Sequence, residues 1–243
     1  MRNLNYNELA SAYARHRVAS SLVLDELQRG RVLYPESKVL EAGCGTGSHL
    51  RALVKSAGCL GWGVDPSPEM LRHALGGDSV HFLQGSAGEL PFGDGLFDLV
   101  FSVNVIHHMK NTISYFCEAL RVLKPDGVVC TVTDSEKIIR NRKPLARYWP
   151  GTVEADLKRY PAIALLRQQM IAVGFVDIEE HEICRAFKVT DVAPYREKAF
   201  SCLHLISEEE FLSGLRRLES DLRAGPVQGV SEYVCLWGRC PEV

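Results

Sequence analysis

Short apolar runs alternate with longer amphipathic segments over much of the chain. The apolar runs of strand length are residues 38–43, 60–65, 80–85, 97–104 and 127–134. The segments between them that are predicted to be helices are residues 48–57, 67–75 and 111–123. Strands that alternate with helices predict βαβ units, and therefore a parallel sheet that helices cover on both faces.

The ends of the chain extend this pattern. Residues 6–29 are predicted to be one helix, because apolar side chains recur near a period of 3.6 residues. Ser67 followed by Pro68 is a typical helix start, and the proline and glycine of residues 124–127 are expected to stop the helix before them.

The alternation of predicted strands and helices stops after residue 135. Residues 135–162 hold three prolines, many charges and several aromatic side chains, which predicts an insertion or lid. A helix over 163–174, a strand over 176–183, a helix over 207–225 capped by Ser207 and a strand over 232–240 follow. These last elements can complete the sheet, with one added strand antiparallel.

Size and composition indicate an ordinary globular protein. The chain has 243 residues, 46% of them hydrophobic, and a formal net charge of -2. This charge disfavours broad contact with nucleic acid, which needs clustered Lys and Arg. No apolar stretch is long enough to span a membrane, and the polar N-terminus lacks the apolar core of a signal peptide, so a cytoplasmic location is expected. Eight scattered cysteines without a C-x-x-C favour reduced, buried thiols over disulfides, and no metal site is predicted.

A glycine-rich turn follows the first predicted strand, in the sequence VLEAGCGTG (39–47). Its glycines are Gly43, Gly45 and Gly47, and a helix starts directly after them. Backbone N–H groups at such a turn can approach an anionic ligand. The spacing G-x-G-x-G departs from the dinucleotide fingerprint, since Ser48 stands where the third glycine would be.

An acid, Asp65, ends the second predicted strand, twenty residues after Gly45. A carboxylate at this place can accept hydrogen bonds from both ribose hydroxyls of an adenosine. The alternative role for Asp65 is an N-cap of the following turn. The glycine turn and the acid together favour a nucleoside-binding site.

With these residues the chain resembles the class I S-adenosylmethionine-dependent methyltransferases, and in particular their small-molecule subgroup. The resemblance lies in VLEAGCGTG (39–47), GVDPSPEML (63–71), GSAGELPFGDGLFDLVFSVNVIHH (85–108) and RVLKPDG (121–127). It implies an α/β, Rossmann-like sheet of seven mostly parallel strands with the last strand antiparallel, and S-adenosylmethionine as the cofactor.

The resemblance also implies roles for single residues. Glu41 would lie near the amino group of the cofactor, and Ser102 near its methionine part. Asp65 would hold the ribose. The other positions matched to cofactor contacts are Tyr13, Arg17, Gly43, Gly45, Pro66, Met70, Ser86 and Ala87, with Arg17 pairing with the cofactor carboxylate and Ser86-Ala87 bordering adenine. Many relatives have Asp at Ser86, so the charge-assisted bond to adenine is absent here. The residues alone leave open that Glu41 only complements a helix dipole and that Arg17 is a surface charge.

Methyl transfer needs alignment and exclusion of water, and a base only where the acceptor must lose a proton. His107 follows the fourth strand and is the candidate base, whereas His108 is expected to pack. Candidate acceptor contacts in the lid are Tyr148, Trp149, Tyr195 and Arg196, with a loop that merely anchors its aromatic side chains as the alternative.

The expected protein is one domain over 1–243. Residues 1–30 would cover the cofactor, 38–134 form the cofactor-binding core, 135–207 partly form the lid, and 208–243 supply the final helix and strand. The expected activity is methyl transfer to an O, N or C atom of a small molecule, by a monomer or homodimer without nucleic acid or membrane partners. Alternatives are a non-catalytic S-adenosylmethionine-binding protein, a nucleic-acid methyltransferase and, disfavoured by the glycine spacing, an NAD-linked dehydrogenase.

Overall fold

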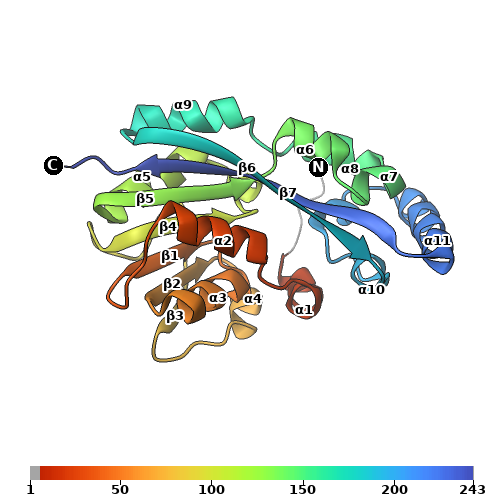
Figure 1. Ribbon diagram of the computed structural model, residues 1–243, viewed down its shortest axis with the longest axis horizontal. Coiled ribbons are helices and arrows are strands. Elements are labelled where there is room, and N and C mark those ends of the chain that lie inside the picture. The colour runs from red at the N-terminus through yellow and green to blue at the C-terminus, as the bar shows by residue number, and fades with distance from the viewer. Residues whose placement is uncertain (1–5, 243) are drawn as a thin grey trace.

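The computed structural model describes residues 6–242 and contains one seven-stranded sheet (Figure 1). Its strands are β1 (Lys38–Ala42), β2 (Leu60–Asp65), β3 (Val80–Gln84), β4 (Phe97–Val103), β5 (Leu123–Thr133), β6 (Val176–Val189) and β7 (Val227–Arg239). They lie in the order β3-β2-β1-β4-β5-β7-β6, and β7 is antiparallel to both of its neighbours. The predicted fold class, with a last strand antiparallel, is confirmed.

Helices cover both faces of this sheet, as predicted (Figure 1). One hydrophobic core joins the sheet to α5 (Thr112–Val122) and α9 (Ile163–Val173). The other joins it to α2 (Ser21–Gly30) and α3 (Ser48–Ala57). The carboxyl ends of the central strands therefore stay free between the two helix layers, which is where ligands bind in such sheets.

The N-terminal segment differs from the prediction of one long helix. α1 (Tyr6–His16) ends before Arg17, and α2 starts at Ser21. The break has a tertiary cause, because the Ser20 N–H donates a hydrogen bond to His49 Nε2 at 3.1 Å. This contact ties the break to the start of α3.

Some predicted boundaries also move. α5 ends at Val122, just before residues 124–127, as predicted, but these residues already belong to β5, since Leu123 pairs with Phe97 of β4. α4 (Pro68–Arg72) is shorter than predicted, although Ser67 does cap it by accepting a hydrogen bond from the Met70 N–H. β6 and β7 are longer, because they continue as an antiparallel pair beyond the rest of the sheet.

The far end of this strand pair carries a separately packed segment, the lid (Figure 1). Its helices are α6 (Glu136–Asn141), α7 (Leu145–Tyr148), α8 (Gly151–Leu157), α10 (Ala193–Arg196) and α11 (Glu208–Ala224). A third hydrophobic core centred on Trp149, Phe211 and Leu218 holds the lid together. The lid is thus a folded unit with its own core.

All eight cysteines are free thiols, but Cys117 and Cys184 are exposed, contrary to the expectation that the cysteines are buried. Within residues 6–242, no helix is both long and apolar enough to cross a membrane.

Candidate active site

The glycine turn between β1 and α3 has a left-handed backbone at all three glycines. Their φ angles are +75° at Gly43, +53° at Gly45 and +70° at Gly47. A Cβ on Gly43 would lie 2.4 Å from Val105 Cγ1, and one on Gly47 would lie 2.2 Å from Phe82 Cζ. A Cβ on Gly45 would meet no protein atom within 4 Å. Gly43 and Gly47 are therefore needed for packing, whereas Gly45 faces open space.

Asp65 fixes this turn to the end of β2. Its Oδ2 accepts a hydrogen bond from the Gly45 N–H at 2.8 Å, and its Oδ1 accepts one from the Ser67 N–H at 2.9 Å. Burial raises the pKa of the Asp65 carboxyl, and the two N–H donors oppose this effect. Because Ser67 caps α4, Asp65 is not the N-cap, and its carboxylate oxygens keep lone pairs for a ligand.

Glu41 lies on β1, two residues before Gly43, and its side chain is almost completely buried. Its Oε2 accepts a hydrogen bond from the Leu50 N–H at 3.0 Å, in the first turn of α3. Burial raises the pKa of Glu41 to about 8, against the effect of the Leu50 N–H. The carboxyl is therefore largely protonated at neutral pH.

His49, also in the first turn of α3, has no counterpart in the sequence-based site. Its Nδ1 lies 4.0 Å from Glu41 Oε1, and burial lowers its pKa to about 4, with a smaller contribution from the charge of Arg17. His49 is thus neutral and accepts from the Ser20 N–H. The only sequence signal for it is its place at the helix start, directly after the glycine turn.

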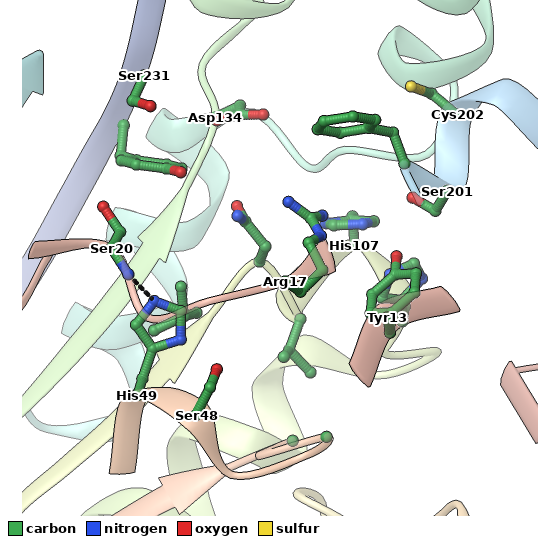
Figure 2. A pocket seen from close by; sticks show the side chains of 18 of the residues that line it. Tyr13, Arg17, Ser20, Ser48, His49, His107, Asp134, Ser201, Cys202 and Ser231 are labelled. Carbon is green, nitrogen blue, oxygen red and sulfur yellow. Dashed lines mark hydrogen bonds between the residues drawn. The ribbon is translucent and has the colours of Figure 1, made fainter. Parts of the chain in front are cut away.

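These residues form one wall of a cavity of about 330 Å³. Figure 2 shows Ser48 and His49 on one side, Ser201 and Cys202 on the other, and Arg17 between them in this view. Ten of the sequence-predicted site residues line the cavity: Tyr13, Arg17, Glu41, Gly43, Gly45, Asp65, Pro66, Met70, His107 and Tyr195. The structure therefore brings most of the predicted cofactor contacts together.

Three predicted cofactor contacts lie outside the cavity lining. Ser86 Oγ accepts a hydrogen bond from the Gly88 N–H at 3.2 Å, and Ala87 belongs to the core under α5. Ser102 is fully buried and accepts a hydrogen bond from the Tyr115 hydroxyl at 3.2 Å. The contacts with adenine or methionine that the sequence predicts for these three residues remain predictions, and none of the three side chains lines the cavity.

Three predicted acceptor contacts belong instead to the lid itself. Trp149 is fully buried, and its Nε1–H donates to the Phe211 carbonyl at 2.9 Å. The Tyr148 hydroxyl donates to Asp221 Oδ2 at 2.6 Å, and Arg196 forms an exposed ion pair with Glu219. Tyr195 stacks on Trp149, yet it also lines the cavity. Tyr148 and Trp149 therefore build the lid core rather than the cavity wall, whereas Tyr195 contributes to both.

The lid side of the cavity has a buried ion-pair network that sequence analysis missed in part. Arg142 pairs with Asp134, at the end of β5, and its Nη1 lies 2.7 Å from Asp156 Oδ2. Arg159 also contacts Asp156, through Nε at 2.7 Å, and donates to Ser201 Oγ at 2.8 Å. An acid at the carboxyl end of a parallel strand is the signal that identified Asp65, and the same signal identifies Asp134.

His107 lies in the 3-10 helix η1 (Ile106–His108), which follows β4 and lines the cavity. Its ring stacks on Tyr160, with 3.8 Å between ring centres and 17° between planes. Both ring nitrogens are covered, and neither has a hydrogen-bond partner in the part of the chain that the structure describes. Burial, followed by the neighbouring His108, Arg159, Arg142 and Arg17, lowers the pKa of His107 well below its usual range.

Arg17 enters the cavity from the break between α1 and α2 (Figure 2). Its guanidinium lies 5.2 Å from the centre of the Tyr13 ring and 5.1 Å from that of Phe200. Among the side chains that the structure describes, which leave out residues 1–9, 12 and 243, no carboxylate forms an ion pair with it. A partly buried cation without a counter-ion favours an anionic group on the ligand.

Comparison with known proteins agrees with this geometry. The methyltransferase domain family matches residues 40–131. A tRNA U34 carboxymethyltransferase of Aeromonas salmonicida is 41% identical over 149 residues, which make up 58% of this chain and 45% of that protein. A demethylmenaquinone methyltransferase of Tropheryma whipplei is 30% identical over 146 residues, 55% of this chain and 60% of that protein. The chain thus spans about half the length of the curated relatives it matches.

The fold has a close match among solved structures. A protein of Anabaena variabilis, described as a methyltransferase from an antibiotic biosynthesis pathway, aligns with a TM-score of 0.72. The alignment covers 91% of this chain and 98% of the other, at 20% sequence identity, so it shows the shared fold alone.

Proposed function

Residues 40–131 form a methyltransferase domain of the class I, S-adenosylmethionine-dependent family, and on this premise we propose that the protein methylates a small molecule. The observation that carries the proposal is the pairing of the Gly45 backbone with Asp65 at the cavity wall. A cradle that a Cβ at Gly45 would fill, next to a carboxylate with free lone pairs, fits the ribose of an adenosine.

The other cavity residues fit the methionine part of S-adenosylmethionine. Glu41 is placed to accept from its ammonium group, and Arg17 is placed to pair with its carboxylate. The bound cofactor supplies a methyl group that the sulfonium already activates. The chain itself then has to hold the acceptor in line and exclude water, which the packed lid favours.

A small-molecule acceptor is supported by the lid side of the cavity. Arg142 and Arg159 are committed to buried ion pairs, so they are not available as a set of cations for a phosphate backbone. The cavity of about 330 Å³ lies at the lower end of the range for small-molecule sites.

Methylation of a nucleic acid is a second candidate, favoured by the 41% identity to a tRNA-modifying enzyme. One experiment separates the two. The protein is incubated with S-adenosylmethionine and either a small-molecule library or total tRNA, and release of S-adenosylhomocysteine is measured. Release with small molecules alone supports the proposal, release with tRNA alone supports the second candidate, and binding without release supports a non-catalytic protein.

A further inference from the structure

The lid side of the cavity has more cationic than free anionic groups. The charged and titratable groups that face or adjoin His107 are Arg17 before α2, His108 in η1, Asp134 at the end of β5, Arg142 and Lys143 after α6, Asp156 and Arg159 in and after α8, Tyr160, Cys202 in η2 (Ser201–His204), and Glu232 and Tyr233 in β7. Asp134 and Asp156 are bound to Arg142 and Arg159. Glu232 is therefore the one carboxylate of this side that has no ion pair within the described residues.

Bound S-adenosylmethionine would not remove this excess. Its carboxylate can neutralise Arg17, and Glu41 can neutralise its ammonium, but the sulfonium adds a further positive charge beside the acceptor position. A cationic acceptor would have to enter a partly dehydrated space beside this sulfonium, whose positive charge would repel it. In a region of low effective dielectric, such repulsion is costly.

His107 is unsuited to the role of general base in this surrounding. Accepting a proton would place an imidazolium next to the cations of Arg142 and Arg159. Its neutral ring, however, has one N–H donor whose partner is absent among residues 6–242. A buried donor without a partner is destabilising unless a ligand supplies the acceptor atom.

We propose that the methyl acceptor binds as an oxyanion, namely an ionised phenol, enol or carboxylic acid, and that neutral His107 donates a hydrogen bond to this oxygen. The inference rests on the proposed methyltransferase function. A lone pair of the oxygen forms the new O–CH₃ bond, the S–CH₃ bond breaks, and its electron pair stays on sulfur. No proton leaves in this step, because the acceptor has lost its proton to water on binding.

The ionisation of a bound phenol tests this proposal directly. The native protein is saturated with S-adenosylmethionine or S-adenosylhomocysteine and titrated with 4-nitrophenol, whose phenolate absorbs visible light. We expect the pKa of the bound phenol to lie at least about one unit below that of the free phenol, with the larger shift beside the sulfonium. An unchanged or raised pKa of the bound phenol would overturn the proposal.

Substitutions at His107 separate a hydrogen-bond donor from a base. His107→Gln keeps a neutral N–H donor, so kcat/KM for an oxygen acid is expected to stay within about threefold, whereas His107→Phe loses about 10–100-fold. Equal losses in both variants, with a pH profile that follows a histidine, would contradict the donor role. Circular dichroism checks that both variants fold.

Glu232→Gln is expected to change the KM values of anionic and cationic acceptors in opposite directions. Removing this carboxylate is expected to lower the KM of an anionic acceptor, because a repulsive charge is lost, and to raise the KM of a cationic acceptor. A raised KM for an oxygen acid would contradict an oxyanionic acceptor.

A matched panel of phenols, enols, carboxylic acids and amines completes the experiment, with methylated products identified by mass spectrometry. Methylation at oxygen supports the proposal. If amines alone are methylated, or if no oxygen acid binds or reacts, the proposal fails while the methyltransferase function stands. If the protein does not bind S-adenosylmethionine in a calorimetric titration, both fail.

Discussion

At the scale of single residues, burial holds a few polar groups of the cavity wall in unusual protonation states. Glu41 is a buried acid with a pKa of about 8, and His49 next to it is neutral. Both effects come from burial, which disfavours the charged form of each group. Neutral forms of both side chains lower the cost of burying them.

If Glu41 binds the ammonium group of the cofactor as proposed, cofactor binding should depend on pH. Since an ammonium group favours ionised Glu41, binding near pH 7 should release a proton. The dissociation constant is expected to fall by up to about tenfold per pH unit between pH 6 and 7.5, below the range where an α-amino group titrates. Calorimetry in two buffers of different ionisation enthalpy measures the released proton, and Glu41→Gln should release none. No proton release from the native protein would show that Glu41 does not bind the ammonium.

The same raised pKa affects the stability of the ligand-free protein. The folded form binds the Glu41 proton more tightly than the unfolded chain does, so this contribution is fully present below the unfolded pKa of about 4.3 and is lost as pH rises through 8. Urea unfolding of native protein and Glu41→Gln at pH 5 and pH 8 should show that the variant gains relative stability at the higher pH. A difference in stability that is independent of pH would contradict the raised pKa.

At the scale of elements, the glycine turn combines packing at Gly43 and Gly47 with a proposed ligand contact at Gly45. A left-handed conformation costs an alanine about 1–2 kcal/mol. Gly45→Ala should therefore cost little more than this strain in stability, but lose at least about tenfold in cofactor affinity, because the methyl group enters the cavity. Thermal unfolding and calorimetry measure the two effects.

Gly47→Ala is the matched control for this turn. The new Cβ would clash with the Phe82 ring, so stability should fall by more than in Gly45→Ala. If Gly45→Ala binds the cofactor as well as the native protein does, the backbone at Gly45 does not approach the ligand.

The sequence predicts elements better than it predicts their tertiary contacts. α3 and β2 have the predicted bounds, because apolar positions mark both elements and Gly47 and Gly58 flank the helix. The break before α2 was not predictable, since it depends on a hydrogen bond between Ser20 and His49, which lie far apart in the chain. The sequence predicts Trp149 at the acceptor site, but it belongs to the lid core. The two cases cannot be told apart in the sequence, because an aromatic side chain gives the same signal in a core and in the wall of a binding site.

At the scale of the whole molecule, the lid has a hydrophobic core of its own, distinct from the two cores that join helices to the sheet. Most of the proposed cofactor contacts lie on the sheet and the helices that cover it, whereas Arg142, Arg159 and Tyr160 lie on the lid. The chain therefore has two structural parts that contribute to one cavity. The division into a cofactor-binding core and a lid region remains a prediction of function.

Substitutions in the lid core should lower turnover more than they lower the affinity for S-adenosylhomocysteine. Trp149→Ala removes a fully buried indole, which typically costs about 3–5 kcal/mol. We expect a large fall in turnover with a change in S-adenosylhomocysteine affinity of less than about threefold. Trp149→Phe, which keeps much of the packing, should be intermediate. Equal losses of binding and turnover would indicate that the lid also holds the cofactor.

The most direct test of the account is a calorimetric titration of S-adenosylmethionine into the native protein and into Asp65→Ala. The account predicts saturable binding to the native protein and a loss of at least about tenfold in the variant, because charge-assisted hydrogen bonds to the ribose disappear. Thermal unfolding would establish that the variant is folded. No binding to the native protein, or equal affinity in a folded variant, would contradict the assignment of this cavity as an S-adenosylmethionine site.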